Sequence, residues 1–369
     1  MTGLTTESPL LPAPSASIPE AAATAVTDPA TEPGQWQAIH VYYGAIRQAM
    51  LTTCVKPLIE GLRQDGLIDG YFFINYWLEG PHLRLRLKPC SASVTDEVVG
   101  RAQQAIAAFL RTRPALYEAR SDMFVELYST LFDLEFTPEE RSRYVGPDGR
   151  MLFRDNNTFS SEPYEPEYAK YGGVAGVALA EWHFQHSTDL VIDILRTMNV
   201  HLRTVVLGIA AQLMMVMSTT FLPDAATTAE YLQRYHDFWN SAFDSTTFVQ
   251  PEGYDLAYQA MGTGVQARFS AVRSALALGA TDRLPAFLRA WAEHCAELRS
   301  RVAALAEVGE LSFTAWDGTG TEQTDDPAEA ASRLLSPYMH MTNNRLGVTL
   351  ADEAYLSHVL ARALREVTP

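Results

Sequence analysis

A short segment holds the residues whose types and spacing best suit chemistry on an anion. Residues 80–86 read Gly-Pro-His-Leu-Arg-Leu-Arg. In a strand alternate side chains share a face, so His82, Arg84 and Arg86 would point one way and Leu83, Leu85 and the following Leu87 the other. Two guanidinium groups about 7 Å apart, from the rise of a strand, could hold a dicarboxylate or a carboxylate plus a developing anion. The alternative is an edge strand with a solvated, charged outer face.

A second polar segment, residues 336–347, concentrates His340, two asparagines and Arg345 between two helical patterns. A histidine here could move protons near neutral pH, which is its distinctive chemical capacity. The asparagines and Gly347 also suit the end of a helix, where Arg345 could bond to terminal carbonyls. Both interpretations stay open from the local pattern.

Two weaker candidates lie in the middle of the chain. Residues 165–173 end in two glycines before a long helical pattern, and the exposed N–H groups of such a turn favour anions, with Lys170 adding positive charge. A plain turn is the alternative. His183 and His186 stand three residues apart on one helix, but no HExxH or CxxC motif accompanies them, so we predict no metal site. The sequence also has no P-loop, GxGxxG or GxSxG motif, and we expect no cofactor.

The elements that must position these residues are a small sheet and many helices. Residues 37–43, 71–77 and 82–88 read as strands, and the turn residues between the last two predict an antiparallel hairpin. Helical spacing covers residues 45–64, 95–111, 175–199, 201–219, 226–243, 263–279, 282–305, 328–339 and 350–366. The last helix begins with a capping-box pattern from Thr349 to Asp352. The predicted class is α+β, a small antiparallel sheet with a large helical portion and a helix-rich C-terminal half.

The chain begins with a stretch of different composition. Residues 1–35 are rich in Pro, Ala and Thr and hold almost no large apolar side chains, so we predict a disordered tail. No comparable break follows, and residues 36–369 are predicted to form the folded domain.

Charge and composition exclude several classes of function. The formal net charge of −16 over 369 residues argues against a nucleic acid partner, which needs clustered basic residues. No Lys or Arg precedes residue 36, so a secretory signal is not expected. The three cysteines lack metal-type spacing and fit a reducing compartment. The longest apolar run, residues 205–217, is shorter than the roughly 20 residues of a membrane span. We therefore expect a cytoplasmic protein that does not enter a membrane.

Taken in order, five segments resemble the elimination domain of class I lantibiotic dehydratases, also called the thiopeptide-type bacteriocin biosynthesis domain when it occurs as a separate protein. These segments are residues 36–43, 71–76, 80–86, 164–173 with Glu181 and Phe184, and 340–347. The resemblance implies work on a ribosomally made precursor peptide. A partner protein first esterifies Ser or Thr with glutamate taken from glutamyl-tRNA. The elimination domain then removes the α-proton and expels glutamate, which leaves dehydroalanine or dehydrobutyrine.

The resemblance also implies that Arg84, Arg86 and His340 are catalytic and that position 170 binds substrate through Lys170. We expect His82 and Arg345 to assist substrate binding as well, with a structural role as the alternative for Arg345. This set agrees with the chemistry, because a glutamate that leaves as a carboxylate needs cationic stabilisation. Lys170 departs from the family pattern, which usually has an arginine there. Lysine keeps the charge but lacks the planar fork that binds a carboxylate through two hydrogen bonds.

Two other functions stay open. Some separate relatives of this family perform a formal [4+2] cycloaddition between two dehydroalanines, which builds the pyridine of thiopeptides and releases the leader peptide. A third possibility is a non-catalytic partner that binds the leader peptide and presents it to the glutamylating protein. The expected partners in each case are the precursor peptide, leader plus core, and a glutamylating dehydratase. The oligomeric state does not follow from the sequence.

Overall fold

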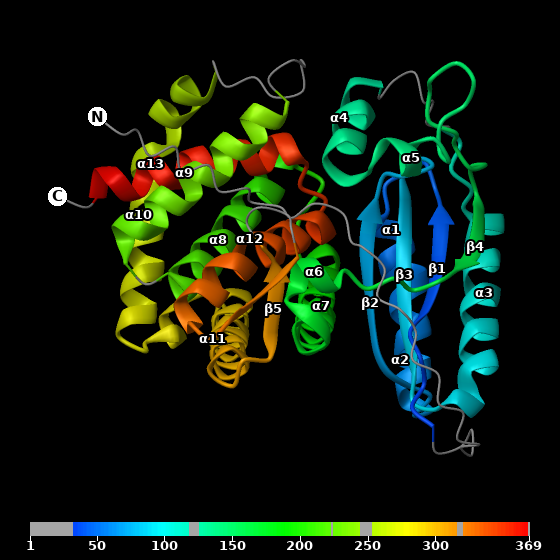
Figure 1. Cartoon of the computed structure of the whole chain (residues 1–369). Coiled ribbons are helices and arrows are strands. Elements are labelled where there is room, and N and C mark those ends of the chain that lie inside the picture. Colours follow the sequence, from blue (N-terminus) through cyan, green and yellow to red (C-terminus); the bar gives the residue numbers. More distant parts are fainter. Residues whose placement is uncertain (1–31, 118–124, 223, 244–252, 316–319, 368–369) are drawn as a thin grey trace. The chain divides into compact units, whose positions relative to one another are not determined.

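The computed structural model describes residues 32–117, 125–222, 224–243, 253–315 and 320–367, and these group into two compact units. The sheet unit contains the described residues of Ala16–Pro166 and Phe184–Asn199. The helical unit contains those of Glu167–His183 and Val200–Pro369. Most of the predicted disordered tail lies outside the described residues, and the single domain from residue 36 onward stays a prediction. The predicted α+β class is confirmed, with a small antiparallel sheet and a helix-rich C-terminal half (Figure 1).

Four antiparallel strands form the sheet in the order β2-β3-β1-β4. Their bounds are Gln37–Tyr42 for β1, Ile68–Tyr76 for β2, His82–Pro89 for β3 and Thr158–Glu162 for β4. The predicted hairpin of β2 and β3 is confirmed, and Gly80 in its turn has a φ of 102° that favours glycine. Because β3 pairs with β2 on one side and β1 on the other, the alternative of a solvated edge strand is wrong.

The two faces of β3 differ in chemistry as the alternation predicts. Leu83, Leu85 and Leu87 are at most 1% exposed. They share their face with apolar residues of the neighbouring strands, such as Ile39 and Phe73. The helices α2 (Lys56–Gln64) and α3 (Thr95–Thr112) pack against these strands, as Figure 1 shows. The arginines therefore stand on a strand that is fixed on both edges and anchored by its leucines.

The last turns of α7 (Gly173–Thr197) complete the sheet unit along β2. The Tyr71 hydroxyl donates to Asp189 over 2.6 Å, and the rings of Phe72 and Phe184 lie 5.4 Å apart. The remaining elements of this unit are α1 (Gln48–Met50), the π-helix Leu51–Val55, the 3₁₀ turn Ala92–Val94, α4 (Val125–Glu135) and α5 (Pro138–Arg141). The helical pattern predicted for residues 45–64 is thus α1, the π-helix and α2 in sequence.

The helical unit is built around α8 (Arg203–Phe221), which contacts α10, α11, α12 and α13. By length and composition α8 could cross a membrane, but 56% of its most apolar stretch is buried inside the protein. The Trp291 indole also donates to the Leu213 carbonyl of α8 over 3.1 Å. These contacts are those of a core helix, as the sequence predicted.

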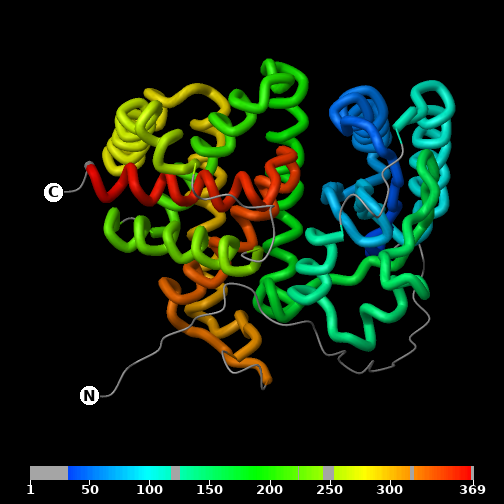
Figure 2. The backbone as a smooth tube through the Cα atoms, turned by 90° about the horizontal axis from the view of Figure 1, so that it is seen from above, coloured from blue at the N-terminus to red at the C-terminus, as the bar shows by residue number. Residues whose placement is uncertain are grey.

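Further helices and two short strands complete the helical unit. They are α6 (Tyr168–Tyr171), the first part of α7, α9 (Ala225–Ala242), α10 (Tyr254–Ala277), the 3₁₀ turn Thr281–Arg283, α11 (Ala286–Glu307), β5 (Leu311–Thr314), β6 (Thr321–Thr324), α12 (Pro327–Leu346) and α13 (Leu350–Val367). Helices α9 and α13 pack along each other, which Figure 2 shows from above. The predicted capping box of α13 is confirmed, because Thr349 and Asp352 bond to each other's backbone N–H groups.

Two helix boundaries differ most from the sequence prediction. Residues 336–346 do not lie between helices, because α12 continues through Pro337 and ends only at Gly347, whose φ is 82°. Polar residues interrupt the apolar periodicity of this part of α12, but the structure buries them. Thr342 and Asn343 are at most 2% exposed. Helix α10 begins at Tyr254 rather than at residue 263.

Candidate functional site

The polar face of the sheet gathers side chains from neighbouring strands. The register places Arg84 opposite His40 of β1, and places His82 between Tyr76 of β2 and Tyr42 of β1. The Arg84 guanidinium carbon lies 3.4 Å from the centre of the Tyr76 ring. Because the residues are paired by backbone register, their spacing is set by the sheet and not by flexible loops.

His82 holds Arg84 in place. Its Nδ1 lies 2.9 Å from the Gly80 carbonyl, which can only accept, so Nδ1 carries the proton. Its Nε2 then has a lone pair, which accepts the Arg84 Nε–H over 3.1 Å. Burial, followed by the Arg84 charge, lowers the pKa of His82 to about 3. His82 is therefore neutral and engaged at both ring nitrogens, as a support for the arginine.

Arg86 is held in the same manner by His40, which the sequence interpretation missed. The Arg86 Nη1 donates to His40 Nε2 over 3.2 Å. Burial first, then the Arg84 charge, lowers the pKa of His40 to about 2, so this imidazole is neutral as well. The pKa of Arg86 falls to about 10 through burial and the Arg84 charge, which leaves Arg86 positive at neutral pH. Its guanidinium also lies 5.5 Å from the centre of the Tyr164 ring.

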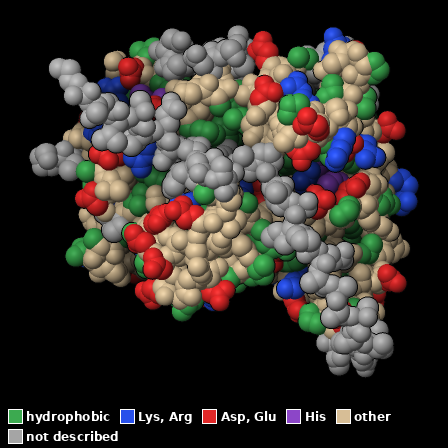
Figure 3. All heavy atoms as spheres, in the orientation of Figure 1, with side chains coloured by type: hydrophobic (Ala, Val, Ile, Leu, Met, Phe, Trp, Pro, Cys, Tyr) green, Lys and Arg blue, Asp and Glu red, His purple; other side chains and the backbone are tan. Residues whose placement is uncertain are grey.

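Neither cation forms an ion pair with a carboxylate in the part of the chain that the structure describes. Among the described residues, no carboxylate lies within ion-pair distance of Arg84 or Arg86, and the Nε of Arg86, a residue only 4% exposed, has no hydrogen-bond partner. Acidic side chains are scattered over the visible surface (Figure 3), so the pair opposes the net charge of −16. A buried cation without a counter-ion is costly, and an anionic ligand would compensate it. We refer to Arg84 and Arg86 with His40 and His82 as the arginine face.

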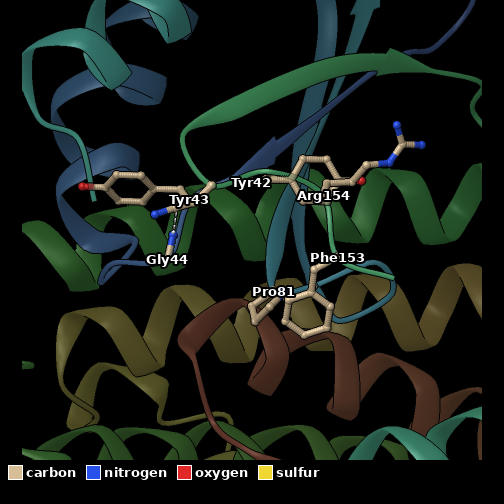
Figure 4. A pocket seen from close by; sticks show the side chains of 8 residues that line it. Tyr42, Tyr43, Gly44, Pro81, Phe153 and Arg154 are labelled. Carbon is tan, nitrogen blue, oxygen red and sulfur yellow. Dashed lines mark hydrogen bonds between the residues drawn. The ribbon is translucent and has the colours of Figure 1, made fainter. Parts of the chain in front are cut away.

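A small hollow lies beside the end of β1 and the turn that precedes β3 (Figure 4). Its volume is about 20 Å³, which suits one water molecule and is too small for a peptide side chain. Phe153 and Pro81 lie next to each other in Figure 4, and the Tyr43 ring points away from them. The lining residues are Tyr42, Tyr43, Gly44, Gly80, Pro81, Phe153, Arg154 and Asn156.

The helical unit carries His340 on α12. Its Nδ1 lies 3.0 Å from Oε1 of Glu353 on α13, and the Glu353 side chain is fully buried. The Tyr235 hydroxyl of α9 donates to the other oxygen of the same carboxylate. The His340 side chain is 21% exposed, so part of the ring reaches the surface. A histidine backed by a buried carboxylate is an arrangement suited to proton transfer.

The other two expected site residues have protein partners in the helical unit. The Lys170 ammonium lies 3.2 Å from the Glu167 carboxylate, one turn earlier. The Arg345 guanidinium donates to the Met341 carbonyl of its own helix over 2.8 Å, and burial lowers its pKa to about 9. Only 1% of Arg345 is exposed, which matches the helix-end interpretation offered by the sequence.

The structure thus brings together three of the six predicted residues, His82, Arg84 and Arg86, on one face of the sheet unit. Lys170, His340 and Arg345 belong to the helical unit. Sequence reasoning missed His40, Glu353 and Tyr235. The alternation of side chains in the predicted strand 37–43 could have revealed His40. His40 and Tyr42 lie two residues apart in this strand and so point to the same face of the sheet. The sequence carries no comparable signal for Glu353 and Tyr235, because only the packing of α9, α12 and α13 brings them to His340.

No metal site emerges in the part of the chain that the structure describes, where no group of three His, Cys, Asp or Glu side chains could hold an ion. His183 instead bonds to His294, with 2.9 Å between Nδ1 and Nε2 in the interior of the helical unit.

Comparisons with known proteins agree on the fold. Residues 36–364 match the family model described as lantibiotic biosynthesis dehydratase C-term. The pyridine synthase TbtD from thiomuracin biosynthesis is 22% identical, with a TM-score of 0.69 over 90% of this chain and 98% of that one. TsrL is 17% identical, with a TM-score of 0.65 over 90% and 95%. The tRNA-dependent lantibiotic dehydratase MibB from Microbispora sp. 107891 is 16% identical, with a TM-score of 0.52 over 94% of this chain and 29% of that one. No curated protein matches the sequence.

Proposed function

We propose that this chain, which belongs to the lantibiotic biosynthesis dehydratase C-terminal family, eliminates glutamate from a ribosomally made precursor peptide. Its substrates are the Ser or Thr residues of that peptide that carry a glutamyl ester. In this reaction the α-proton leaves to a base, its bonding electrons form the Cα–Cβ double bond, and the Cβ–O ester bond breaks. Glutamate departs with the electron pair of that bond as a carboxylate. The product is dehydroalanine or dehydrobutyrine.

The observation that carries this proposal is the arginine face. Negative charge develops on the leaving ester oxygen, and fixed donors aimed at such a charge lower the barrier. Arg84 and Arg86 are donors held by neutral histidines, and no described carboxylate lies within ion-pair distance of either guanidinium. The second carboxylate of the departing glutamate would take the other guanidinium. A cycloaddition between two uncharged alkenes has no comparable need for two cations.

The proposed partners follow from the reaction. The substrate is the core of a precursor peptide whose leader directs it to the enzyme, and a glutamylating dehydratase supplies the ester. We place these steps in the cytoplasm, where glutamyl-tRNA is made.

The test mixes the purified chain with a glutamylated precursor and follows the peptide by mass spectrometry. Loss of glutamate with formation of an alkene is expected. The Arg84→Ala, Arg86→Ala double variant should lose at least about 100-fold in rate, the scale of removing a fixed transition-state donor. Arg101→Ala is a matched control in the same unit, because Arg101 is exposed and paired with Asp65 and Glu97. A double variant as active as the unmodified protein would refute the assignment.

Pyridine formation by [4+2] cycloaddition is the second candidate. It is favoured by the fold match to a pyridine synthase, which extends over nearly all of that chain. Lys170 also favours cycloaddition. Its ammonium group is ion-paired with Glu167, which makes it poorly suited to bind glutamate. Incubation with a fully dehydrated precursor separates the candidates, since leader release with macrocycle formation would support cycloaddition. A peptide that binds but stays unchanged with both substrates would support a leader-binding role without catalysis.

A further inference from the structure

The contacts around His340 are more specific than those of an ordinary buried histidine. Nδ1 faces both oxygens of the Glu353 carboxylate, at 3.0 and 3.3 Å. Trp239 of α9 flanks the imidazole, with ring centres 5.8 Å apart. Three helices therefore fix this one ring, since α12 carries it, α13 supplies the carboxylate, and α9 supplies Trp239 and the tyrosine that bonds to the carboxylate.

We propose that Glu353, itself held by Tyr235, is a positioning residue that fixes the proton of His340 on Nδ1 and leaves Nε2 as the base of the elimination. This inference rests on the proposed function. A carboxylate accepts hydrogen bonds, so the nitrogen facing it is the one that carries the proton. The opposite nitrogen then has the lone pair, on the ring edge farthest from the buried carboxylate.

The path of the α-proton is consistent with this role of His340 and Glu353. Nε2 takes the α-proton as the ester bond breaks, and the imidazole becomes a cation. Glu353 lies where that new charge forms and stabilises it through the Nδ1–H bond, the role that a buried carboxylate performs for a catalytic histidine. The proton later passes from Nε2 to water, which restores the neutral ring.

Tyr235 stabilises the buried Glu353 carboxylate by donating a hydrogen bond to it. Glu353 has no exposed side-chain surface, and a buried carboxylate must be hydrogen-bonded to remain charged. Burial, then the Glu353 charge, raises the pKa of Tyr235 well above its ordinary value, so the hydroxyl stays a donor at any physiological pH. Its bond is to Oε2, and the Oε1 oxygen is the one nearer to His340 Nδ1, at 3.0 Å.

The test compares Glu353→Gln and the milder Tyr235→Phe with the unmodified protein. Glu353→Gln should lower kcat about tenfold or more with KM within about twofold, because the residue acts on proton transfer and not on binding. Glu353→Asp should recover part of the rate. Tyr235→Phe should show the same changes at smaller size.

The chain offers a matched control on the same helix. The Glu366 carboxylate also accepts a tyrosine hydroxyl, from Tyr258 over 2.8 Å, but faces no histidine in the described structure. Glu366→Gln and Tyr258→Phe should therefore leave kcat unchanged.

A readout independent of activity separates this inference from the proposed function. Nitrogen-15 NMR of labelled histidine reports the tautomer of His340, with the His340→Gln spectrum as its assignment. The expected result is the Nδ1–H form in the unmodified protein and a mixture in Glu353→Gln. The same tautomer in both proteins, or an unchanged kcat in Glu353→Gln, would overturn the inference. Failure of the unmodified protein to release glutamate would instead refute the proposed function and, with it, the role of Nε2 as its base.

Discussion

Each arginine of the arginine face is held by an uncharged histidine, and this choice of partner has a chemical reason. An aspartate or glutamate in the place of His40 or His82 would orient the guanidinium equally well but would neutralise its charge. A neutral imidazole accepts the hydrogen bond and leaves the full positive charge available to a ligand. The cost is that each ring must stay neutral, which burial and the adjacent cations impose.

That neutrality predicts a loss of stability in mild acid. The pKa of His82 is about 3 in the folded protein, whereas the unfolded chain binds this proton near pH 6.5. The unfolded state therefore gains a proton first as the pH falls, and between pH 7 and pH 5 the unfolding free energy should drop by about 2 kcal/mol through His82 alone. Urea unfolding at the two pH values measures the drop.

The control for this prediction is a second histidine of the sheet unit. His82→Gln should shrink the pH-dependent drop by about 2 kcal/mol, since glutamine does not titrate. His186→Gln, at an exposed position on α7, should leave the drop unchanged. Equal effects of the two variants would contradict the neutral, buried state of His82.

At the scale of elements, α12 shows how a helix can carry polar chemistry inside a core. His340, Asn343 and Arg345 are spaced along its last turns, and the helix packs against α8 and α11. The chain can stop and turn toward α13 because Gly347 adopts a φ of 82° at the C-cap. The turn between α12 and α13 therefore depends on a backbone conformation that favours glycine.

Substitution of Gly347 tests this dependence. Gly347→Ala should lower the unfolding free energy by about 1 kcal/mol, because no other atom lies within 4 Å of the added methyl group and only the left-handed backbone opposes it. Gly208→Ala, in the exposed interior of α8 with equally open space, should raise it by about 1 kcal/mol. Thermal or urea denaturation gives both values. A neutral Gly347→Ala would show that the C-cap bears no strain.

Sequence patterns predict these elements well where side-chain periodicity is strong. The alternation in residues 82–88 gives both the strand and its two faces, and the capping box gives the start of α13. Prediction fails where tertiary contacts override the pattern. Strand β4, Thr-Phe-Ser-Ser-Glu, has little apolar alternation and exists because β1 offers it an edge. Glycines at 262 and 264 interrupt the pattern of α10, yet the helix continues through them.

For the site, sequence and resemblance predicted the arginines and His340, but not the groups that control them. The pairing of Arg86 with His40 requires the register of β1 against β3, which local alternation does not determine. The bond between Tyr235 and Glu353 joins residues more than 100 positions apart. The burial that keeps His82 neutral depends on packing between different strands.

At the scale of the whole molecule, a strongly acidic chain presents a cationic site. The net charge of −16 generates a repulsive field for acidic peptides at a distance, whereas Arg84 and Arg86 attract a carboxylate only at short range. The field is screened by salt, with a Debye length of about 8 Å at physiological ionic strength. Binding at the arginine face, which is largely buried, is screened much less.

This difference in range predicts a salt dependence that varies with the leader peptide. At about 20 mM salt, kcat/KM for a glutamylated precursor with an acidic leader should be lower, by about threefold or more, than for one with a neutralised leader. The two values should converge at about 200 mM salt as the long-range repulsion is screened. Initial rates with the two precursors at both salt concentrations give the comparison. A ratio independent of salt would show that the net charge does not govern encounter.

The central position of β3 also limits how a gene for this protein can change. A codon gained or lost between the hairpin turn and Arg84 would move every following side chain to the opposite face, until the register is restored. The leucines would then face the ligand and the arginines the core. Lineages that acquire a new reaction on this scaffold should therefore do so by exchanging residues at fixed positions, with length variation confined to segments outside the strand.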